Sequence, residues 1–416
     1  MKKRYAIRPL AFLLSLVLLL STWASALTPE QAGTLLSTYY IDPVPQEVLD
    51  QDTIEKMLEV LGDPYTEYFT PEEYAAFTAS MLDTTLVGIG ITSQNAGNGL
   101  LLTSVIPGSP AEQGGLAAGD IITAIDGHST IGENSAVIST WISGEAGSEV
   151  TITYEREGKS ETVTLRRAVI TIPAASTELV DGHIGSISCS TFGEDTTTHI
   201  TEGVTALKDQ ADHWIIDLRD NGGGVVGDAL QSAGVFTGAG VLGYLRNGAG
   251  RYSMLGSRQE AVTSYPAIVL TNHNTASASE LFASAIRDGG AGIMVGGRTF
   301  GKGVAQSLFD KDNMPEYFAD GSGMKITSQR FFAANGAATD TVGVIPHLMV
   351  DPELAEDVAR LLSDTGPKEN TEGYLQLDLS WRWYIKLEDA LKNQAAFAAL
   401  LEAIPSNAQL LEGTGG

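Results

Sequence analysis

Cysteine and histidine are scarce in this 416-residue chain, and their scarcity removes several classes of chemistry. The single cysteine, Cys189, excludes an intramolecular disulfide. Because it ends an apolar alternation that begins at Ile184, we expect a buried strand position rather than a reactive thiol. The 6 histidines form no H-E-x-x-H motif and no paired cysteine and histidine spacing. The sequence therefore supports no metal site and implies no cofactor.

Basic residues are also few, with 25 Lys and Arg against 51 Asp and Glu and a formal net charge of −26. A chain this acidic is repelled by phosphate backbones, which excludes nucleic acid as a partner. We assign the acidity no specific ligand, because solubility alone accounts for it. With 43% hydrophobic residues, the chain is not of low complexity, and its length predicts two or three domains with substantial cores.

The first 26 residues resemble an export signal. Four basic residues precede the apolar run Leu10–Leu20, and Ala24-Ser25-Ala26 has the small-x-small pattern of a signal-peptidase site. We expect an extracytoplasmic protein. Cleavage after Ala26 and retention of residues 9–26 as a membrane anchor both stay open, since that stretch is close to the shortest spanning length. With no cysteine near the cleavage site, we do not expect a lipoprotein.

Pattern changes divide the rest of the chain into four parts, which together predict an α/β multidomain fold. Residues 27–83 are helical in character, with proline after a capping threonine at Thr28 and at Thr70. Residues 84–168 show short strands and glycine turns, and residues 366–416 form an extension to which we assign no role. In residues 169–365 apolar strands alternate with amphipathic helices. The expected elements of that part are Ile184–Ser188, His199–Asp209, Trp214–Leu218, Ala229–Val235, Ala267–Thr271, Ser277–Arg287 and Gly292–Val295.

Residues 84–168 resemble a PDZ domain in the circularly permuted order of bacterial proteases. The motifs that carry the likeness are Leu86–Ile91, Val105–Ala111 and the long run Gly119–Gly127. The resemblance implies that the loop Gly88, Ile89, Gly90 and Ile91 binds a terminal carboxylate through its backbone amides, while the next strand offers an edge to a peptide. A generic glycine-rich β domain is the alternative.

Ser277 and Lys302 are the candidate reactive residues. A seryl oxygen needs a base, and lysine can serve once burial has lowered its pKa. We expect such burial because Gly296–Gln306 contains no acidic residue. Two alternatives stay open. Ser277 and Glu280 fit a helix capping box. Gly296–Lys302 fits the G-x-x-x-x-G-K motif of a phosphate loop, although the residues after it alternate like a strand where a phosphate loop needs a helix.

The run Trp214–Gly224 predicts a buried strand that ends in three glycines, where backbone amides can approach a substrate oxygen. Ala278, which follows the serine, is the other natural donor to an oxyanion. We interpret Asp217, Arg219 and Asp220 as ion pairs that fix the loop. His273, four residues before Ser277, leaves a Ser-His-Asp triad open, although no acid partner has a suggestive spacing.

In this order, the PDZ-like part, D-L-R-x-N-x-G-G, S-A-S-E and F-G-K-G resemble the C-terminal processing peptidases over roughly residues 30–365. The resemblance implies a crotonase-like and Clp-like α/β core. It assigns Ser277 as nucleophile, Lys302 as general base and Gln306 as its assistant, with oxyanion donors at the amides of Gly223 and Ala278. Gly222 replaces the family's usual proline, which loosens that loop.

We therefore expect an exported serine endopeptidase that captures protein or peptide substrates by a free C-terminus and cleaves them with a Ser/Lys dyad. The alternatives are a catalytically silent peptide-binding scaffold and a crotonase-type thioester hydrolase, which would not need a PDZ-like domain. Substrate identity and oligomeric state, a homo-oligomer included, stay open.

Overall fold

The computed structural model describes residues 26–82, 85–106, 108–133, 135–171, 174–193, 195–362 and 371–412. Apart from Ala26, the expected export segment lies outside these residues. Within them, no helix has the length and apolarity needed to cross a membrane. The chain divides into two compact units, one taking the chain up to Ala76 together with Gln306–Thr327, and the other taking Phe77–Ala305 with Ser328–Gly416.

The first unit is built from helices, as its sequence predicts. Thr28 accepts the N–H of Gln31, and its own N–H donates to the Gln31 side chain, a reciprocal cap that begins the first helix. Residues 306–327, which the sequence pattern groups with the peptidase core, fold with this unit instead. Its elements are α1 (Pro29–Tyr39), α2 (Gln46–Leu49), α3 (Ile54–Leu61), β1 (Glu67–Phe69), α10 (Pro315–Phe318), the first part of α4 (Pro71–Leu82), most of β17 (Val304–Phe309) and the first part of β18 (Gly323–Ala333).

The PDZ-like part is a sheet of order β3-β4-β5-β7-β8 with two helices, packed around a core that includes Ile89, Leu102 and Ile152. Among the described residues, β3 lies at one edge of this sheet. The elements are β3 (Ile91–Ala96), β4 (Gly99–Val105), α5 (Pro110–Gln113), β5 (Ile121–Ile125), β6 (His128–Ser129), α6 (Ser135–Ile142), β7 (Glu149–Arg156) and β8 (Lys159–Arg166), while β2 (Thr85–Gly88) pairs with β9 (Ala168–Thr171).

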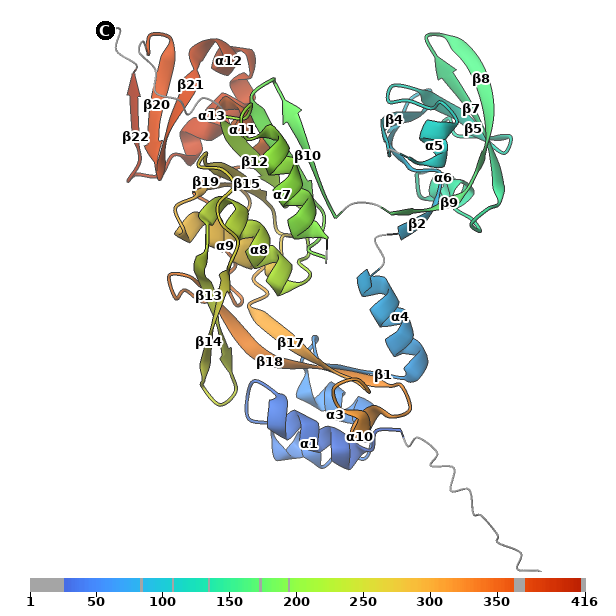
Figure 1. Ribbon diagram of the computed structural model, residues 1–416, viewed down its shortest axis with the longest axis vertical. Helices are drawn as coiled ribbons and strands as arrows, with labels where there is room; N and C mark the ends of the chain where they lie inside the picture. Colours follow the sequence, from blue (N-terminus) through green and yellow to red (C-terminus); the bar gives the residue numbers. More distant parts are fainter. Residues whose placement is uncertain are drawn as a thin grey trace, which may run out of the picture. The chain divides into compact units, whose positions relative to one another are not determined.

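The α/β core is centred on a six-stranded sheet of order β10-β11-β12-β15-β16-β19 (Figure 1). All neighbours pair in parallel except β10 with β11. The strands are β10 (Ala175–Val180), β11 (Ile184–Cys189), β12 (His213–Asp217), β15 (Ala267–Thr271), β16 (Gly292–Gly296) and β19 (Leu348–Met349). The expected fold class, α/β and multidomain, is confirmed.

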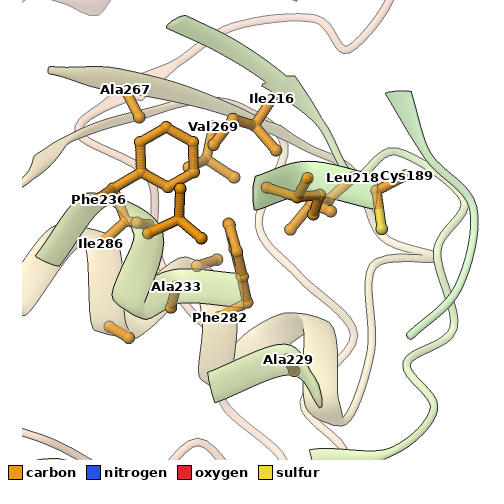
Figure 2. Packing of buried hydrophobic residues seen from close by; sticks show 14 of the residues in the cluster. Cys189, Ile216, Leu218, Ala229, Ala233, Phe236, Ala267, Val269, Phe282 and Ile286 are labelled. Atoms are coloured by element: carbon orange, nitrogen blue, oxygen red, sulfur yellow. The ribbon is translucent and has the colours of Figure 1, made fainter. Parts of the chain in front are cut away.

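Three helices cover one face of this sheet: α7 (Thr196–Leu207), α8 (Val226–Thr237) and α9 (Ala278–Asp288). Figure 2 shows the packing beneath them, where Ile216 and Val269 from the strands meet Phe236 and Phe282 from the helices. Cys189 is buried in the same layer, as its apolar context predicts. Burial of side chains of this size is the main favourable term in folding, about 1.5–3 kcal/mol each.

The opposite face is covered by α11 (Ala355–Leu361) and by the C-terminal extension. Side chains alternate along a strand, so Ile215 and Ile268 point away from the α8–α9 layer. They belong to a second buried cluster, formed with residues of α11 and of the extension. Trp383 of the extension is fully buried there, so the extension contributes to the core on this face of the sheet. The elements of the extension are β20 (Tyr374–Leu379), β21 (Trp381–Lys386), α12 (Leu387–Lys392), α13 (Gln394–Ala403) and β22 (Gln409–Glu412).

A further sheet has the order β1-β18-β13-β14, with β17 paired to β18. Its strands besides β1 are β13 (Gly240–Asn247), β14 (Tyr252–Ser257), β17 (Val304–Phe309) and β18 (Gly323–Ala333). The strand β17 matters for the site because it begins two residues after Lys302.

Candidate active site

Three loops that follow neighbouring parallel strands carry the candidate residues. The glycine loop follows β12, the serine follows β15, and the lysine loop follows β16. In the sheet, Asp217 pairs with Leu270 and Thr271 pairs with Gly296, so the three carboxyl ends lie side by side. This edge of a parallel sheet is where α/β folds place their ligand sites.

Ser277 lies in a strained turn at the start of α9. Its φ of 58° and ψ of −120° fall in a region that non-glycine residues rarely occupy. A sharp strand-to-helix turn of this kind presents a seryl oxygen above the sheet edge, as in the nucleophile elbow of other hydrolases. Ala278 is the first helical residue, and a helix supplies no acceptor for the N–H at that position.

Glu280 ties the serine to the lysine loop. Its Oε2 accepts the main-chain N–H of Ser277 at 2.8 Å and of Lys302 at 2.9 Å. Its Oε1 accepts the Thr299 hydroxyl at 2.6 Å and the Gly301 N–H at 2.8 Å. The glutamate half of the expected capping box is thus present, and it also fixes a loop about twenty residues further along the chain.

Glu280 is completely buried. Burial raises the pKa of its carboxyl group, while the hydrogen bonds from Thr299, Ser277, Gly301 and Lys302 act in the opposite direction by favouring the carboxylate. Four donors around one buried carboxylate satisfy both of its oxygens, and an unsatisfied buried acid would be costly. Glu280 therefore acts as a hub, by which we mean one buried side chain that holds the start of α9 and the lysine loop together through hydrogen bonds.

Lys302 lies in the loop between β16 and β17. Gly301, with φ of 95°, precedes it, and Gly303 packs so closely against Asp340 that a Cβ there would come 2.3 Å from the Asp340 nitrogen. The N–H of Gly303 donates to Asp340 Oδ1 at 3.2 Å. The segment itself contains no acidic residue, but Glu280 and Asp340, from other elements, accept hydrogen bonds from its backbone.

The glycine loop packs against the serine. A Cβ on Gly223 would come 2.9 Å from Ser277 Cβ and 3.0 Å from the Ala278 nitrogen. Asn221, fully buried, holds the loop: its Oδ1 accepts the Gly223 N–H at 2.9 Å and the Ser279 hydroxyl at 2.8 Å, and its Nδ2 donates to the Cys189 carbonyl at 2.9 Å. The expected oxyanion donor at Gly223 thus bonds to Asn221 in this structure.

Of the three charged residues that begin the loop, Asp217 and Arg219 form the expected ion pair, whereas Asp220 forms hydrogen bonds to neutral side chains instead. Arg219 pairs with Asp217 at 2.5 Å and donates to the Pro352 carbonyl at 2.9 Å. Asp220 Oδ1 accepts the side-chain amides of Asn272 at 2.9 Å and Asn274 at 2.8 Å, which joins the glycine loop to the loop before the serine. These contacts position the site.

Two alternatives from the sequence are not favoured. A strand, β17, follows Lys302 where a phosphate loop needs a helix, so the nucleotide interpretation is wrong. The second alternative is the Ser-His-Asp triad. Its histidine, His273, is exposed, and its ring lies 5.4 Å from that of Phe300. Cys189 lies beneath Asn221, and burial raises the pKa of its thiol to about 12, which keeps it protonated at neutral pH.

Gln306 follows the lysine loop closely, and the loop that is expected to bind a terminal carboxylate lies about two hundred residues earlier, between β2 and β3. Gln306 is on β17, and its Nε2 donates to Thr327 Oγ1 at 3.3 Å. Gly88 ends β2 and Ile91 begins β3, with Ile89 and Gly90 buried between them. Gly90 has φ of 82°, and a Cβ there would come 2.3 Å from Ser109 Cβ, so both conformation and space require glycine.

The sequence did not predict the hydrogen bonds around Asn221, those around Glu280 and Thr299, or one cluster of possible metal ligands. Asn221 and Thr299 gave no signal by themselves, although Asn221 lies inside the D-L-R-x-N motif. In the part of the chain that the structure describes, the side chains able to hold a metal ion are His183, Asp212 and His213, at the amino ends of β11 and β12. Their spacing in sequence resembles no metal motif.

Comparison with known proteins agrees with this geometry. The model of peptidase family S41 matches residues 183–350, and the PDZ domain model matches residues 87–166. A chloroplastic C-terminal processing peptidase of Tetradesmus obliquus is 32% identical over 354 residues, 79% of this chain and 74% of that protein. A "Probable CtpA-like serine protease" of Staphylococcus epidermidis is 28% identical over 346 residues, 80% of this chain and 69% of that protein.

The solved structure of a photosystem II D1 C-terminal processing protease matches with a TM-score of 0.52 and 26% identity, over 81% of this chain and 96% of that one. Fold, site and matches together define a serine-type peptidase that carries a PDZ domain. The chain belongs to peptidase family S41 and, within it, to the C-terminal processing peptidases.

Proposed function

We propose that this protein is an exported endopeptidase in which Ser277 attacks the substrate carbonyl and Lys302 acts as general base. The observation that supports the pairing most directly is the Glu280 carboxylate, which accepts main-chain hydrogen bonds from both residues. Neutral Lys302 takes the proton of the serine hydroxyl as the acyl bond forms. The resulting ammonium then protonates the leaving amine, and water hydrolyses the acyl-enzyme by the same route.

The oxyanion of the tetrahedral intermediate would be bound by the N–H groups of Ala278 and Gly223. Ala278 stands at the N-terminus of an eleven-residue helix, whose dipole favours negative charge there. The N–H of Gly223 must turn from Asn221 Oδ1 toward the substrate. Gln306 would assist Lys302 by hydrogen bonding.

Substrate capture is assigned to the PDZ domain. The loop of Gly88, Ile89, Gly90 and Ile91 would bind the terminal carboxylate, and β3, which is an edge strand among the described residues, would pair with the substrate tail. Main-chain pairing supplies affinity that is largely independent of sequence, so specificity would come from apolar side chains near the terminus. The substrate class is accordingly an unstructured protein with a free C-terminus.

The test is hydrolysis of casein by the purified protein beside Ser277→Ala and Lys302→Ala, with circular dichroism to show that both variants fold. We expect cleavage to vanish in both, while binding of a peptide with a free apolar C-terminus is retained. Normal turnover by Lys302→Ala would overturn the dyad. Binding without hydrolysis in the wild-type protein would favour a silent scaffold. Cell fractionation, with recovery outside the cytoplasm expected, tests export.

A further inference from the structure

Two histidines and an aspartate converge at the end of the sheet that is remote from Ser277. One potential ligand atom from each of His183, Asp212 and His213 lies within 4.8 Å of the other two. Asp212 Oδ1 is 2.6 Å from His213 Nδ1 and 3.3 Å from His183 Nδ1. Imidazole nitrogen and carboxylate oxygen are ligands that divalent transition ions share, zinc above all.

The fold, rather than the spacing in sequence, brings these residues together. His213 begins β12 and His183 directly precedes β11, and the parallel register pairs Ile184 with His213. The N–H of Asp212 donates to the His183 carbonyl at 2.9 Å, which fixes the two chain segments to each other. The three side chains are therefore held by the sheet ladder itself, without dependence on a long loop.

The burial of the cluster suits an ion that enters from solvent. The side chain of His213 is fully buried, and its ring meets Trp383 edge-on with the centroids 6.5 Å apart. The side chains of His183 and Asp212 are 41% and 33% exposed. An ion can therefore reach His183 and Asp212 from solvent, while packing holds the ring of His213 in place as the third ligand. Solvent on the exposed side can supply water as a fourth ligand.

We propose that His183, Asp212 and His213 form a binding site for one divalent transition-metal ion, with Zn²⁺ the best match to this ligand set. The ion takes the place of the hydrogen bonds between the imidazoles and Asp212 Oδ1: each ring binds as neutral imidazole, with its one proton on Nε2 and the lone pair of Nδ1 offered to the ion. Tetrahedral zinc bonds of about 2.0–2.1 Å place ligand atoms roughly 3.3 Å apart, which small side-chain rotations achieve here.

The site is structural and not part of hydrolysis, because it lies at the amino ends of the strands whose carboxyl ends lead to Ser277 and to the glycine loop. An ion that binds only the folded chain stabilises it by mass action. It would join the starts of β11 and β12 beside Trp383 and so link the sheet to the C-terminal extension. The competing explanation is a histidine-aspartate hydrogen-bond network that takes no ion.

The test is titration of the untagged, chelator-treated full chain with Co²⁺, followed by its visible d–d absorption and by displacement with Zn²⁺. We expect one ion per chain and a higher thermal midpoint with Zn²⁺. His183→Ala removes a half-buried ligand and should weaken binding at least roughly tenfold, since even outer-shell partners of metal ligands contribute that much. His199→Ala, on α7 outside the cluster, is the matched control and should bind as the wild type does.

Casein hydrolysis at the wild-type rate by His183→Ala would show that this variant folds. Three results would overturn the site: no cobalt absorption from the wild-type protein, equal affinity in His183→Ala and wild type, or an equal loss in His183→Ala and His199→Ala. Loss of binding confined to His183→Ala, with hydrolysis retained, supports it. A second variant, Asp212→Asn, should reproduce that loss if the carboxylate is a ligand.

Discussion

The main-chain N–H groups of Ser277 and Lys302 donate to one and the same oxygen, Oε2 of Glu280, at 2.8 and 2.9 Å. A buried carboxylate thereby sets the separation between the start of α9 and the lysine loop. Any change in this acid moves both candidate reactive residues relative to each other. Proximity of reacting groups is worth several kcal/mol to an enzyme, so the arrangement has kinetic consequences.

Glu280→Gln should reduce both activity and stability. The amide replaces one accepting oxygen with a donor that faces other donors, and we expect a loss of about 2–3 kcal/mol in the free energy of unfolding. A displacement near 1 Å should also lower kcat/KM roughly a hundredfold. Urea denaturation and casein hydrolysis measure the two effects. Glu202→Gln, an exposed change on α7, is the control, and an equal effect of both substitutions would contradict the hub role.

Asn221→Ala should impair turnover more than substrate binding. It removes the acceptor of the Gly223 N–H and the donor to the Cys189 carbonyl, and leaves the buried Ser279 hydroxyl unsatisfied. We expect kcat to fall about tenfold or more, because the glycine loop loses the side chain that anchors it to the Cys189 carbonyl and to Ser279, with KM nearly unchanged. Ser279→Ala removes only one of these bonds and should cost less. A rise in KM at constant kcat would refute this account.

Gly222→Pro should stabilise the protein without harming it. A Cβ at Gly222 would meet open space, and its φ lies outside the left-handed region. Restricting the unfolded chain at such a position typically adds about 0.4–1 kcal/mol. Gly224→Ala is the contrasting variant, because its φ is 132° and its Cβ would come 2.2 Å from the Phe192 carbonyl oxygen. Chemical denaturation should rank proline above wild type and wild type above alanine; any other order contradicts the prediction.

Stability should fall on acidification in part because of His347. Burial, helped by the charge of Arg287 and opposed by Asp288, lowers the pKa of this histidine from 6.5 to about 4. Its Nδ1 accepts the Met294 N–H at 3.0 Å, which needs the unprotonated nitrogen. Between these pKa values the unfolded chain binds the proton and the folded chain does not, so this stability is present above pH 6.5 and is lost as pH falls toward 4.

This pKa difference contributes about 3 kcal/mol to the free energy of unfolding, at about 1.4 kcal/mol per pKa unit. We expect His347→Gln to be less stable than wild type at pH 7 and to close that gap by pH 4. Comparing the two proteins at each pH cancels the titration of all groups that they share. Denaturation curves from pH 4 to 7 provide the measurement, and a difference that does not change with pH would exclude the histidine as the cause.

Local pattern predicted much of the fold, because strand alternation and helix caps depend on neighbours a few residues away. The core strands around Ile216 and Val269 and the serine at the start of α9 follow from such patterns. Pairing across the chain does not: Glu67 of β1 lies opposite Lys325 of β18, and that contact places residues 306–327 with the N-terminal helices. No local signal encodes that register.

In the site, too, the sequence predicted the local motifs but not the contacts between distant segments. Ser277, Lys302 and the glycine loop are visible as motifs, since each needs particular residues in one short segment. The acids around Lys302 were missed because Glu280 and Asp340 come from α9 and from the segment after β18. Asn221 and the cluster of His183, Asp212 and His213 were missed for the same reason, as only the parallel sheet brings their partners within reach.

Burial of Trp383 against the sheet also orders events during synthesis. A ribosome completes β11, β12, β15 and β16 well before it reaches residues 377–400, so a nascent chain holds the serine and lysine while Ile215, Ile268 and Ile293 still lack their cover. The central sheet can reach its final stability only after those later residues emerge. The peptidase core therefore depends for its full stability on residues that are among the last to be synthesised.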